Sequence, residues 1–441
     1  MVPDEAEHFA YVQSLAENGK RPPRGPPDAP LFSTEERTAG ALARTGGVLA
    51  DTAYKPAWEP SAERAWRAAG ARGLAPGDIA ASGSQTEHTP LYYASEAVPY
   101  AAASGGDLFG RLFLMRLWSG LLMLVTTAGA WLLIGELTGK DRVLQLAGAA
   151  CVGLQPMATF ISAGVNPDAL LYAAYAIALW IGVRLVRRPP SAGAVAGLIG
   201  ATVVAILAKP AGLALVPATA FVLALVARDR LRGSRRAALA GAAAGAGLLV
   251  AGVAVNRGVS GRAPVDLQPA TLRGFGTYLW DFYLPRLPFQ HRYPALSIDN
   301  PGWTVWVKHA WGSFGLLEVQ FPGGVYVVLA AVALGFLVAA GTALAKGRFR
   351  PGRATLAVFG LTAACLVAGI HWVDFQAVNG GGGRVIQGRY LLPLMPIVGV
   401  AVAAALSNLT RRREAGAAVV LGGMAVLQLF SLAVVAGRYF A

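Results

Sequence analysis

The chain has 441 residues, of which 55% are hydrophobic and only 14% are charged, and its mean hydropathy is +0.49. Because a water-soluble domain carries about 25% charged residues, this composition excludes a soluble globular protein. The net charge of +14 does not indicate nucleic-acid binding, because the basic residues stand in short clusters between long apolar runs, a pattern that reports membrane topology. The sequence therefore predicts an all-α integral membrane protein that crosses the bilayer several times.

A polar N-terminal region, residues 1–110, precedes ten apolar segments. Most of the segments are near the ~20 residues that a helix needs to span a bilayer. They comprise residues 113–135, 143–164, 168–187, 192–208, 211–227, 237–256, 323–345, 354–372, 391–409 and 416–437. An aromatic-rich loop separates the sixth segment from the seventh, so the predicted organisation is 1–110, 111–256, 257–322 and 323–441. The aromatic residues of this loop are typical of a membrane interface, and the alternative is that they stack on a sugar or lipid.

Every second connection between the segments carries clustered Lys and Arg residues, and the short connections between them are almost free of positive charge. By the positive-inside rule the basic connections are cytoplasmic, so the regions 1–110, 257–322 and 373–390 and the C-terminus face outward. An outward N-terminal region needs a preceding helix to carry it across the membrane. We therefore expect an eleventh helix before Met1, missing from a chain that starts too late.

The sequence predicts a short helix that starts at residues 3–9, PDEAEHF, with proline at the first helical position and acids in the first turn. On such a helix Asp4 and His8 are spaced i, i+4 and Glu5 and His8 are spaced i, i+3, so they share a face. Ionised acids beside an imidazole bind a divalent cation or act as a general base on a hydroxyl. The spacing also fits a capped amphipathic helix whose acids are solvated.

An outward turn at residues 164–168 contains Asn166 and ends at Asp168, which lies at the start of a helix, where an acid is favourable. Two interpretations are open. The turn is either a plain Asn-Pro turn with an acidic cap, or a second set of polar groups that converges on the same outer site as residues 3–9.

Lys209, Arg384 and Arg389 stand at the outward ends of spans, where cations are disfavoured. Arg389 also lies near a helix N-terminus, where a cation opposes the helix dipole. An anionic partner such as a lipid phosphate would explain these three residues. The alternative is snorkelling at the interface, or pairing with an acid such as Asp374.

Short motifs occur in a fixed order along the chain. They are Pro3-Asp4-Glu5 followed by His8-Phe9, His88-Thr89-Pro90-Leu91-Tyr92-Tyr93, Asn166-Pro167-Asp168, Lys209-Pro210 and Gly388-Arg389-Tyr390-Leu391-Leu392-Pro393. As an ordered set that extends from Pro3 to about Pro396, they resemble a bacterial membrane-protein family of unknown function. That family is itself similar to the GT-C glycosyltransferases, polytopic enzymes that use polyprenyl-phosphate sugars.

The resemblance implies a GT-C-like enzyme of the bacterial plasma membrane, with its active site in the first outward loop. GT-C enzymes keep an acidic residue there, often in a pair, and Asp4 and Glu5 match that pair as catalytic residues and as candidate ligands of Mg²⁺ or Mn²⁺. Family members carry a transmembrane helix just before this motif, which this chain lacks. The other polar residues of the set become substrate-binding candidates: His8, His88, Tyr92, Asn166, Asp168, Lys209, Arg384, Arg389 and Tyr390.

An active site on the outer face has no access to cytoplasmic nucleotide sugars, so its donor must arrive attached to a lipid. The predicted function is transfer of a sugar from a polyprenyl-phosphate donor to a cell-envelope or surface-glycan acceptor, with Asp4 or Glu5 as the base. Lys209 and Arg389, with Arg384 as a third candidate, would hold the phosphate. One alternative is a transporter or flippase of a lipid-linked envelope precursor, and another is a structural membrane protein. Ion-coupled transporters carry ionisable residues near the membrane midplane, and the predicted spans contain almost none.

Overall fold

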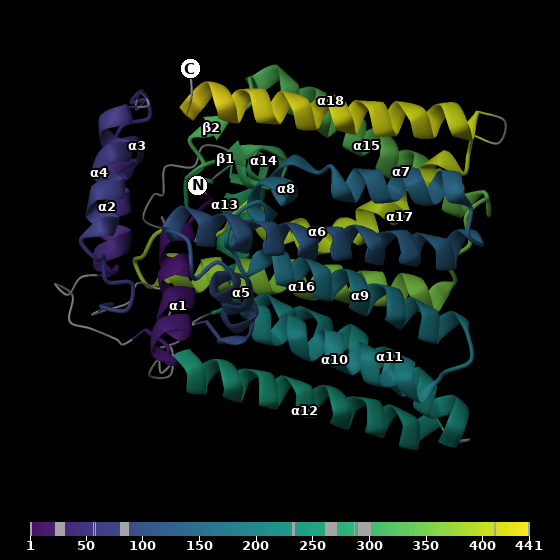
Figure 1. The fold of residues 1–441 in the computed structure, drawn as a ribbon. Helices are drawn as coiled ribbons and strands as arrows, with labels where there is room; N and C mark the ends of the chain where they lie inside the picture. Colours follow the sequence, from purple (N-terminus) through teal and green to yellow (C-terminus); the bar gives the residue numbers. More distant parts are fainter. Residues whose placement is uncertain are drawn as a thin grey trace.

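The computed structural model describes residues 2–22, 31–55, 57, 59–79, 88–231, 234–260, 271–285, 287–289, 301–409 and 412–439. Long helices lie side by side in one bundle, and the short helices and both chain termini gather at one end of it (Figure 1). We call this end the α1 end, because helix α1 (Glu5–Asn18) lies there, and the other end the opposite end.

The elements fall into three groups. The N-terminal region contributes α1, α2 (Thr34–Leu42), α3 (Thr45–Ala50), α4 (Pro60–Ala71) and α5 (Leu91–Ala102). The bundle contains α6 (Leu108–Thr138), α7 (Arg142–Gly153), α8 (Pro156–Ser162), α9 (Asp168–Arg187), α10 (Ala192–Ala208), η2 (Pro210–Leu215), α11 (Val216–Leu231), α12 (Ser234–Ser260), α15 (Gly323–Ala345), α16 (Arg353–Asn379), η4 (Gly388–Leu394), α17 (Met395–Leu406) and α18 (Arg413–Tyr439). Between α12 and α15 lie α13 (Leu272–Tyr283), α14 (Pro301–Trp303), η3 (Thr304–His309), β1 (Ser313–Phe314) and β2 (Val319–Gln320).

Among the described residues, seven helical stretches are long and apolar enough to cross a membrane. They are Leu108–Thr138, Asp168–Arg187, Pro210–Arg228, Gly323–Ala345, Arg353–Asn379, Gly388–Leu406 and Arg413–Tyr439. The predicted segment 143–164 is broken between α7 and α8, which are bent by 60°, and the pair makes an eighth span if it is counted as one. The two remaining predicted segments, 192–208 and 237–256, contain the shorter apolar helices Ala192–Ala208 and Leu239–Val255. The chain is therefore a mostly helical, multi-pass membrane protein, and each of the ten apolar segments lies on helices.

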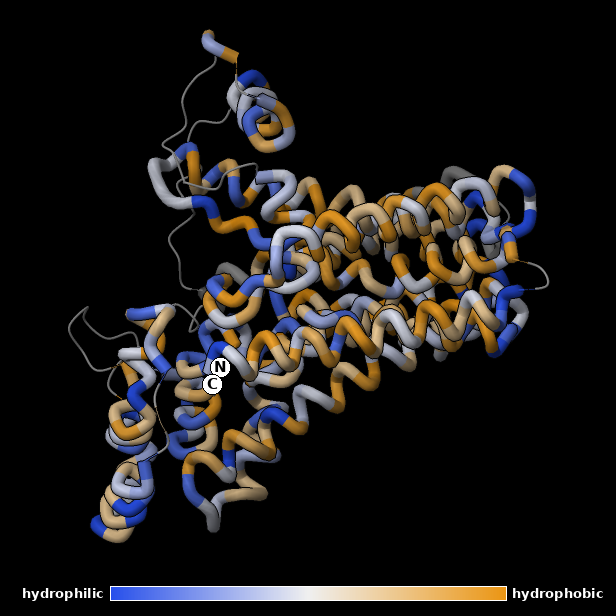
Figure 2. Tube along the Cα trace, turned by 90° about the horizontal axis from the view of Figure 1, so that it is seen from above, coloured by the Kyte–Doolittle hydropathy of each residue, from blue (hydrophilic) through white to orange (hydrophobic). Residues whose placement is uncertain are grey.

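Polar residues are sorted to the ends of the bundle, and hydrophobic residues lie along its length (Figure 2). At the opposite end the basic connections contact one another. Nη1 of Arg187 donates to the carbonyl oxygen of Pro351 at 3.0 Å, and Arg413 forms an ion pair with Asp141 at 2.7 Å. The connections that the sequence analysis assigned to one side of the membrane thus lie together at one end.

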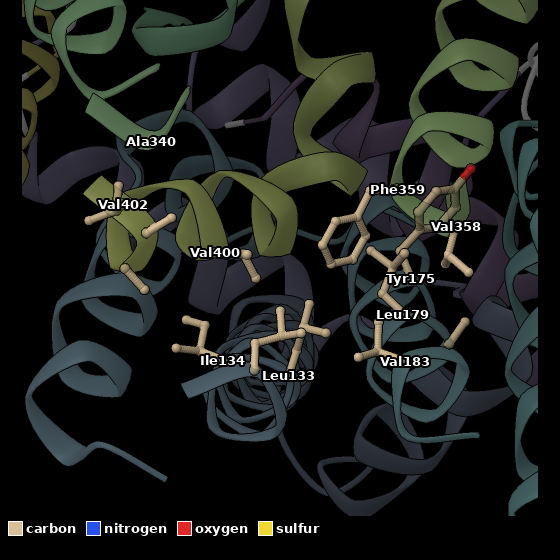
Figure 3. Packing of buried hydrophobic residues seen from close by; sticks show 14 of the residues in the cluster. Leu133, Ile134, Tyr175, Leu179, Val183, Ala340, Val358, Phe359, Val400 and Val402 are labelled. Atoms are coloured by element: carbon tan, nitrogen blue, oxygen red, sulfur yellow. The ribbon is translucent and has the colours of Figure 1, made fainter. Parts of the chain in front are cut away.

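The main core lies between α6, α9, α16 and α17, where aliphatic and aromatic side chains pack together (Figure 3). Leu133 and Ile134 of α6 and Tyr175 of α9 are fully buried there. Small residues bring α7 and α17 closer still, since a Cβ added at Gly148 would stand 2.5 Å from the carbonyl oxygen of Gly399. Close backbone approach at small residues is a common way for helices to associate in a membrane.

We expect Gly148→Ala to lower the melting temperature of the detergent-solubilised protein, because the added methyl group overlaps Gly399. Overpacking of this kind costs about 1–3 kcal/mol. The matched control is Gly200→Ala on α10, where an added Cβ meets nothing within 4 Å and loss of a helical glycine is favourable by about 0.5–1 kcal/mol. Equal melting temperatures for the two variants would contradict the close contact between α7 and α17.

The structure adds one element that the all-α prediction lacks. Strands β1 and β2 pair antiparallel, with Ser313 opposite Gln320, and they pack next to α8 and α18. This hairpin lies in the predicted loop 257–322, of which the structure describes 257–260, 271–285, 287–289 and 301–322.

Candidate functional site

Three charged side chains from separate turns meet at the α1 end of the bundle. Asp168 is the first residue of α9, Lys209 directly follows α10, and Arg389 lies in η4. Nζ of Lys209 lies 2.7 Å from Oδ1 of Asp168, and the charge of Asp168 also acts on Arg389. The sequence analysis named all three residues, and the structure brings them together. We call them the cationic cluster.

Arg389 is the member of this cluster with unused hydrogen-bond donors. It is only 5% exposed, and its Nε and Nη1 have no hydrogen-bond partner among the described residues. One buried carboxylate, Asp168, faces two cations, so the cluster carries a surplus positive charge. A buried guanidinium in this state is stabilised by an anion that accepts its free N–H groups.

The turn that contains η4 fixes the position of this guanidinium. The ring of Tyr390 faces both cations, with its centroid 5.5 Å from Cζ of Arg389 and 5.9 Å from Nζ of Lys209. A Cβ at Gly388 would stand 2.5 Å from the backbone nitrogen of Ala310, so only glycine lets η4 pack this closely against η3. The Gly388-Arg389-Tyr390 sequence therefore supplies a glycine that permits close packing, a cation and the aromatic ring that faces it.

Helix α1 begins at Glu5, two residues later than the sequence predicts, and this changes the position of Asp4. Asp4 precedes the helix with a φ of 60°, in the left-handed region, and it is exposed. The prediction that Asp4 and His8 share one helical face is therefore wrong. A non-glycine residue held in this conformation costs roughly 1–3 kcal/mol, and such residues concentrate at functional sites.

Asn166 joins the N-terminal segment to the cationic cluster. Its Nδ2 donates to the carbonyl oxygen of Pro3 at 3.4 Å, and its Oδ1 accepts from the backbone N–H of Asp168 at 3.0 Å. Because Asp4 follows Pro3, this side chain ties the backbone beside Asp4 to the start of α9, where Asp168 of the cluster lies. The sequence analysis names Asn166 as a substrate-binding residue, and in the structure its amide positions two neighbouring segments.

Glu5 is held by the protein itself. It is buried, and its carboxylate accepts two hydrogen bonds from Arg116, at 2.8 Å from Nε and 2.7 Å from Nη2. The backbone N–H groups of Val165 and Val2 also donate to it, at 3.1 and 3.3 Å. Burial opposes ionisation of Glu5, but the Arg116 guanidinium outweighs burial and holds the pKa of Glu5 below its ordinary value. Glu5 is thus a positioning residue in this structure.

The predicted metal ion has no fitting donor set here. Both oxygens of Glu5 are taken up by Arg116 and backbone N–H groups. In the part of the chain that the structure describes, no group of three or more His, Cys, Asp and Glu residues could hold a metal ion. The role of Asp4 and Glu5 as ligands of Mg²⁺ or Mn²⁺ stays a prediction, and we derive no step through a metal.

His8 of α1 contacts the site from another side. Its Nδ1 lies 2.9 Å from the hydroxyl of Tyr93 on α5, and its ring centroid lies 6.3 Å from that of His88. Burial first, and then the neighbouring His88, Lys209 and Arg389, lower the pKa of His8 well below its ordinary value. His8 is therefore neutral at pH 7 and acts as a hydrogen-bonding group.

Tyr92, which the sequence analysis named, points elsewhere. Its hydroxyl lies 2.8 Å from Oγ of Ser119, within the contact between α5 and α6. The sequence analysis missed Tyr93, which contacts His8, and Tyr172, whose hydroxyl lies 3.5 Å from the carbonyl oxygen of Arg389. Adjacent residues on a helix point about 100° apart, so only one of the two neighbouring tyrosines can face the site. The only sequence feature that pointed to Tyr93 was its position next to Tyr92.

Glu96 is a buried acid in the same contact. Ser119 donates to its Oε1 at 2.7 Å, and burial, reinforced by the charge of Glu5, raises the pKa of Glu96 to about 8. Between its ordinary pKa of 4.5 and about 8, the folded protein binds one proton more than the unfolded chain. Stability contributed by this group is therefore lost as the pH rises through that range, by at most about 1.4 kcal/mol per pH unit.

We expect Glu96→Gln to make the stability of the protein less dependent on pH, because the amide keeps the shape of the protonated acid and does not ionise. Melting temperatures measured from pH 5 to pH 9 should fall less steeply for the variant than for the parent, with the variant the more stable one at the basic end. Parallel curves would show that Glu96 does not control the stability of the contact between α5 and α6.

Arg384 lies in a different cluster from Arg389. Its guanidinium faces the rings of Tyr278 and Phe282 of α13, at 5.9 and 5.5 Å from their centroids. Asp374, the acid considered as a partner for these cations, accepts hydrogen bonds from the hydroxyl of Tyr278 at 2.7 Å and from two backbone N–H groups. The structure therefore gives Arg384 a place between α13 and α16, and the cationic cluster forms without it.

A cavity of about 1450 Å³ is lined in part by Asp4. Its walls come from α1, the three helices α2–α4, the start of α6 and the end of α18. Asp4, Glu5 and Glu7 line it, whereas the residues of the cationic cluster do not. Asp4 thus lines the cavity, and Asn166 links Pro3, the residue before Asp4, to Asp168 of the cationic cluster.

The last turn of α18 fastens one wall of this cavity. Nη1 of Arg438 donates to the carbonyl oxygen of Tyr54 at 2.8 Å, and its Nη2 donates to that of Val48 at 3.1 Å. Tyr439, the next residue, lines the cavity and donates its hydroxyl to Glu318 at 3.1 Å.

Comparisons with known proteins give a family and a distant structural likeness. A family model described as a predicted membrane protein, DUF2142, matches residues 1–398, and no curated protein matches the chain. A crystal structure of ArnT from Cupriavidus metallidurans bound to undecaprenyl phosphate is 16% identical, with a TM-score of 0.42 over 98% of this chain and 62% of its own. The apo structure of the same protein is 15% identical, with a TM-score of 0.44 over 99% of this chain and 59% of its own. The chain thus spans about three-fifths of the length of these structures.

Proposed function

The chain belongs to the DUF2142 family of predicted membrane proteins, and from this premise we propose that it is a membrane glycosyltransferase of the GT-C kind. In this proposal it transfers a sugar from a polyprenyl-phosphate donor to a hydroxyl of a cell-envelope or surface-glycan acceptor. One observation carries the proposal: the buried guanidinium of Arg389 has two nitrogens without a partner among the described residues, and it shares the ring of Tyr390 with Lys209. Asn166 links this cluster to Pro3, which precedes the exposed Asp4. The ordered motifs, which resemble those of proteins similar to GT-C enzymes, supply the reaction class.

The location of the cationic cluster supports a lipid-linked donor. Asp168 begins one candidate membrane span and Arg389 lies in the first turn of another, so the cluster is at the depth of a membrane interface. A phosphate held there leaves its hydrocarbon chain in the bilayer. Because the basic connections lie at the opposite end, the positive-inside rule assigns the α1 end to the outer face, where nucleotide sugars are absent.

The proposed step is a substitution at the anomeric carbon of the donor sugar. The acceptor oxygen bonds to this carbon, the bond from the carbon to the phosphate oxygen breaks, and the electron pair leaves with the polyprenyl phosphate. Asp4 takes the proton of the acceptor hydroxyl. The N–H groups of Nε and Nη1 of Arg389, which have no partner among the described residues, meet the negative charge that develops on the leaving phosphate, which lowers the barrier.

Transfer from a panel of radiolabelled polyprenyl-phosphate sugars, measured with the protein in nanodiscs, tests the proposal. We expect labelled product with the parent and with Gly200→Ala, and far less with Arg389→Ala. A folded parent that transfers sugar from no donor would overturn the proposal.

A transporter or flippase is the second candidate, and one observation favours it. Helices α7 and α8 form a span broken by 60°, and broken helices are typical of transporter binding sites. Against this, the described buried charges near Asp4 lie at one end of the bundle. Movement of a labelled polyprenyl-phosphate sugar across vesicles that contain the protein, without sugar transfer, would favour this candidate.

A further inference from the structure

The cavity beside Asp4 is built as a chamber between the membrane bundle and a separate helical wall. Helices α2–α4 stand beside the α1 end of the bundle (Figure 1). On α4 the residues that line the cavity include Ala62, Glu63 and Trp66, which repeat at helical spacing and form one face. Leu316 of the β1–β2 turn and Val435 of α18 close the chamber from the bundle side.

The lining continues onto the apolar surface of the membrane helices. Phe109 of α6 lines the cavity, and Phe113 and Leu117, at successive i+4 positions, are 60% and 50% exposed on the same helical face. On α18, Val435 lines the cavity and Leu432, three residues before it, is 56% exposed. In a bilayer these faces contact lipid. An apolar chain that lies along α6 or α18 therefore reaches the chamber without crossing water.

The charges of the chamber exclude a second phosphate site. Each of the three arginines in its lining already pairs with a glutamate: Arg44 with Glu59 at 2.7 Å, Arg116 with Glu5 at 2.7 Å, and Arg67 with Glu63. Asp4 and Glu7 also line the chamber and add negative charge to it. A ligand headgroup that approaches Asp4 from this side meets acids, so it must be neutral or positively charged.

We infer that the chamber binds the acceptor, and that the acceptor is an amphipathic molecule with a neutral, hydroxyl-bearing headgroup and an apolar chain. This inference rests on the proposed function, because it gives Asp4 a hydroxyl to deprotonate. The headgroup lies against Asp4 and Glu7, and the chain leaves along Phe109 or Val435 into the bilayer. Donor phosphate and acceptor hydroxyl thus occupy two separate places, the cationic cluster and the chamber.

Photolabelling in nanodiscs tests this inference with two probes that share one chain. The probes are dodecyl β-D-glucoside and dodecyl phosphate, each with a diazirine in the dodecyl chain, and labelled peptides are identified by mass spectrometry. We expect the glucoside to label peptides that contain Leu49, Leu316 and Val435, and the phosphate to label them far less. Ala62→Trp fills the chamber and should abolish this label, whereas Ala68→Trp, on the opposite face of α4, should keep it.

Binding of polyprenyl phosphate to the same variants, followed by native mass spectrometry, separates the two proposals. We expect Ala62→Trp to bind polyprenyl phosphate like the parent, which also shows that the variant is folded. Equal labelling of the chamber by both probes, or labelling that Ala62→Trp leaves unchanged, overturns the acceptor inference alone. In the converse case, the Arg389→Ala variant still binds polyprenyl phosphate and the glucoside still labels the chamber. That result overturns the proposed donor site, whereas the proposed ligand class of the chamber stands.

Discussion

Asp4→Asn is expected to abolish sugar transfer while the protein stays folded and binds its donor. Asparagine has the size of aspartate but does not accept the proton of the acceptor hydroxyl, and the loss of a general base slows a reaction by about 10²- to 10⁴-fold. Asparagine also tolerates the left-handed conformation that Asp4 adopts, with its φ of 60°, so the backbone needs no adjustment. The measurement is kcat for transfer in nanodiscs, beside the binding constant for polyprenyl phosphate.

The control for this variant is Asp51→Asn, which removes an exposed carboxylate at the same end of the protein, outside the cavity lining. We expect its kcat to match that of the parent. If Asp4→Asn transfers sugar at the parental rate, Asp4 is not the base. The base would then have to be another of the carboxylates that line the cavity.

Arg389→Ala is expected to lower kcat by about 10²- to 10³-fold, the loss typical of removing a donor that stabilises charge in the transition state. It should also weaken binding of polyprenyl phosphate, because the surplus positive charge of the cationic cluster disappears. Arg389→Lys should fall between the parent and the alanine variant. Lysine restores the charge but presents a single ammonium in place of the Nε and Nη1 donors that lack partners.

Arg384→Gln is the informative comparison, because the sequence analysis gave Arg384 and Arg389 the same role. In the structure Arg384 faces the rings of Tyr278 and Phe282, so its replacement should change phosphate binding much less than Arg389→Ala does. A larger loss of phosphate binding with Arg384→Gln would reverse the assignment and place the donor phosphate between α13 and α16.

The membrane spans could be predicted from sequence because lipid forces every backbone group into internal hydrogen bonds, so that an apolar run of sufficient length must be helical whatever surrounds it. The break at α7–α8 was missed by the same method. Hydropathy treats 143–164 as one run, whereas Pro156 begins a new helix and the side chain of Gln155 caps it by accepting from the N–H of Ala158. Hydropathy averages do not contain this local chemistry.

Most residues of the site could be predicted from the sequence, but their arrangement could not. Asp168, Lys209 and Arg389 were recognisable because each is a charged residue at the end of an apolar run, and topology brings such ends together. The distinct positions of Asp4 and Glu5 were not recognisable, because two adjacent acids look alike until a partner is known. That partner, Arg116, lies 111 residues away from Glu5, and only the packing of α1 against α6 shows the pair.

The hydrogen bonds of Arg438 have a consequence for biosynthesis. One wall of the chamber comes from the first 75 residues of the chain, and it is fastened by a side chain of the last described helix turn, through the carbonyl oxygens of Val48 and Tyr54. Asp4 is therefore synthesised early, and the chamber that it lines is complete only when α18 has been translated and inserted. Until then a partly made protein carries the proposed base without a complete chamber, so in the proposed mechanism an acceptor is bound only after the last helix has been assembled.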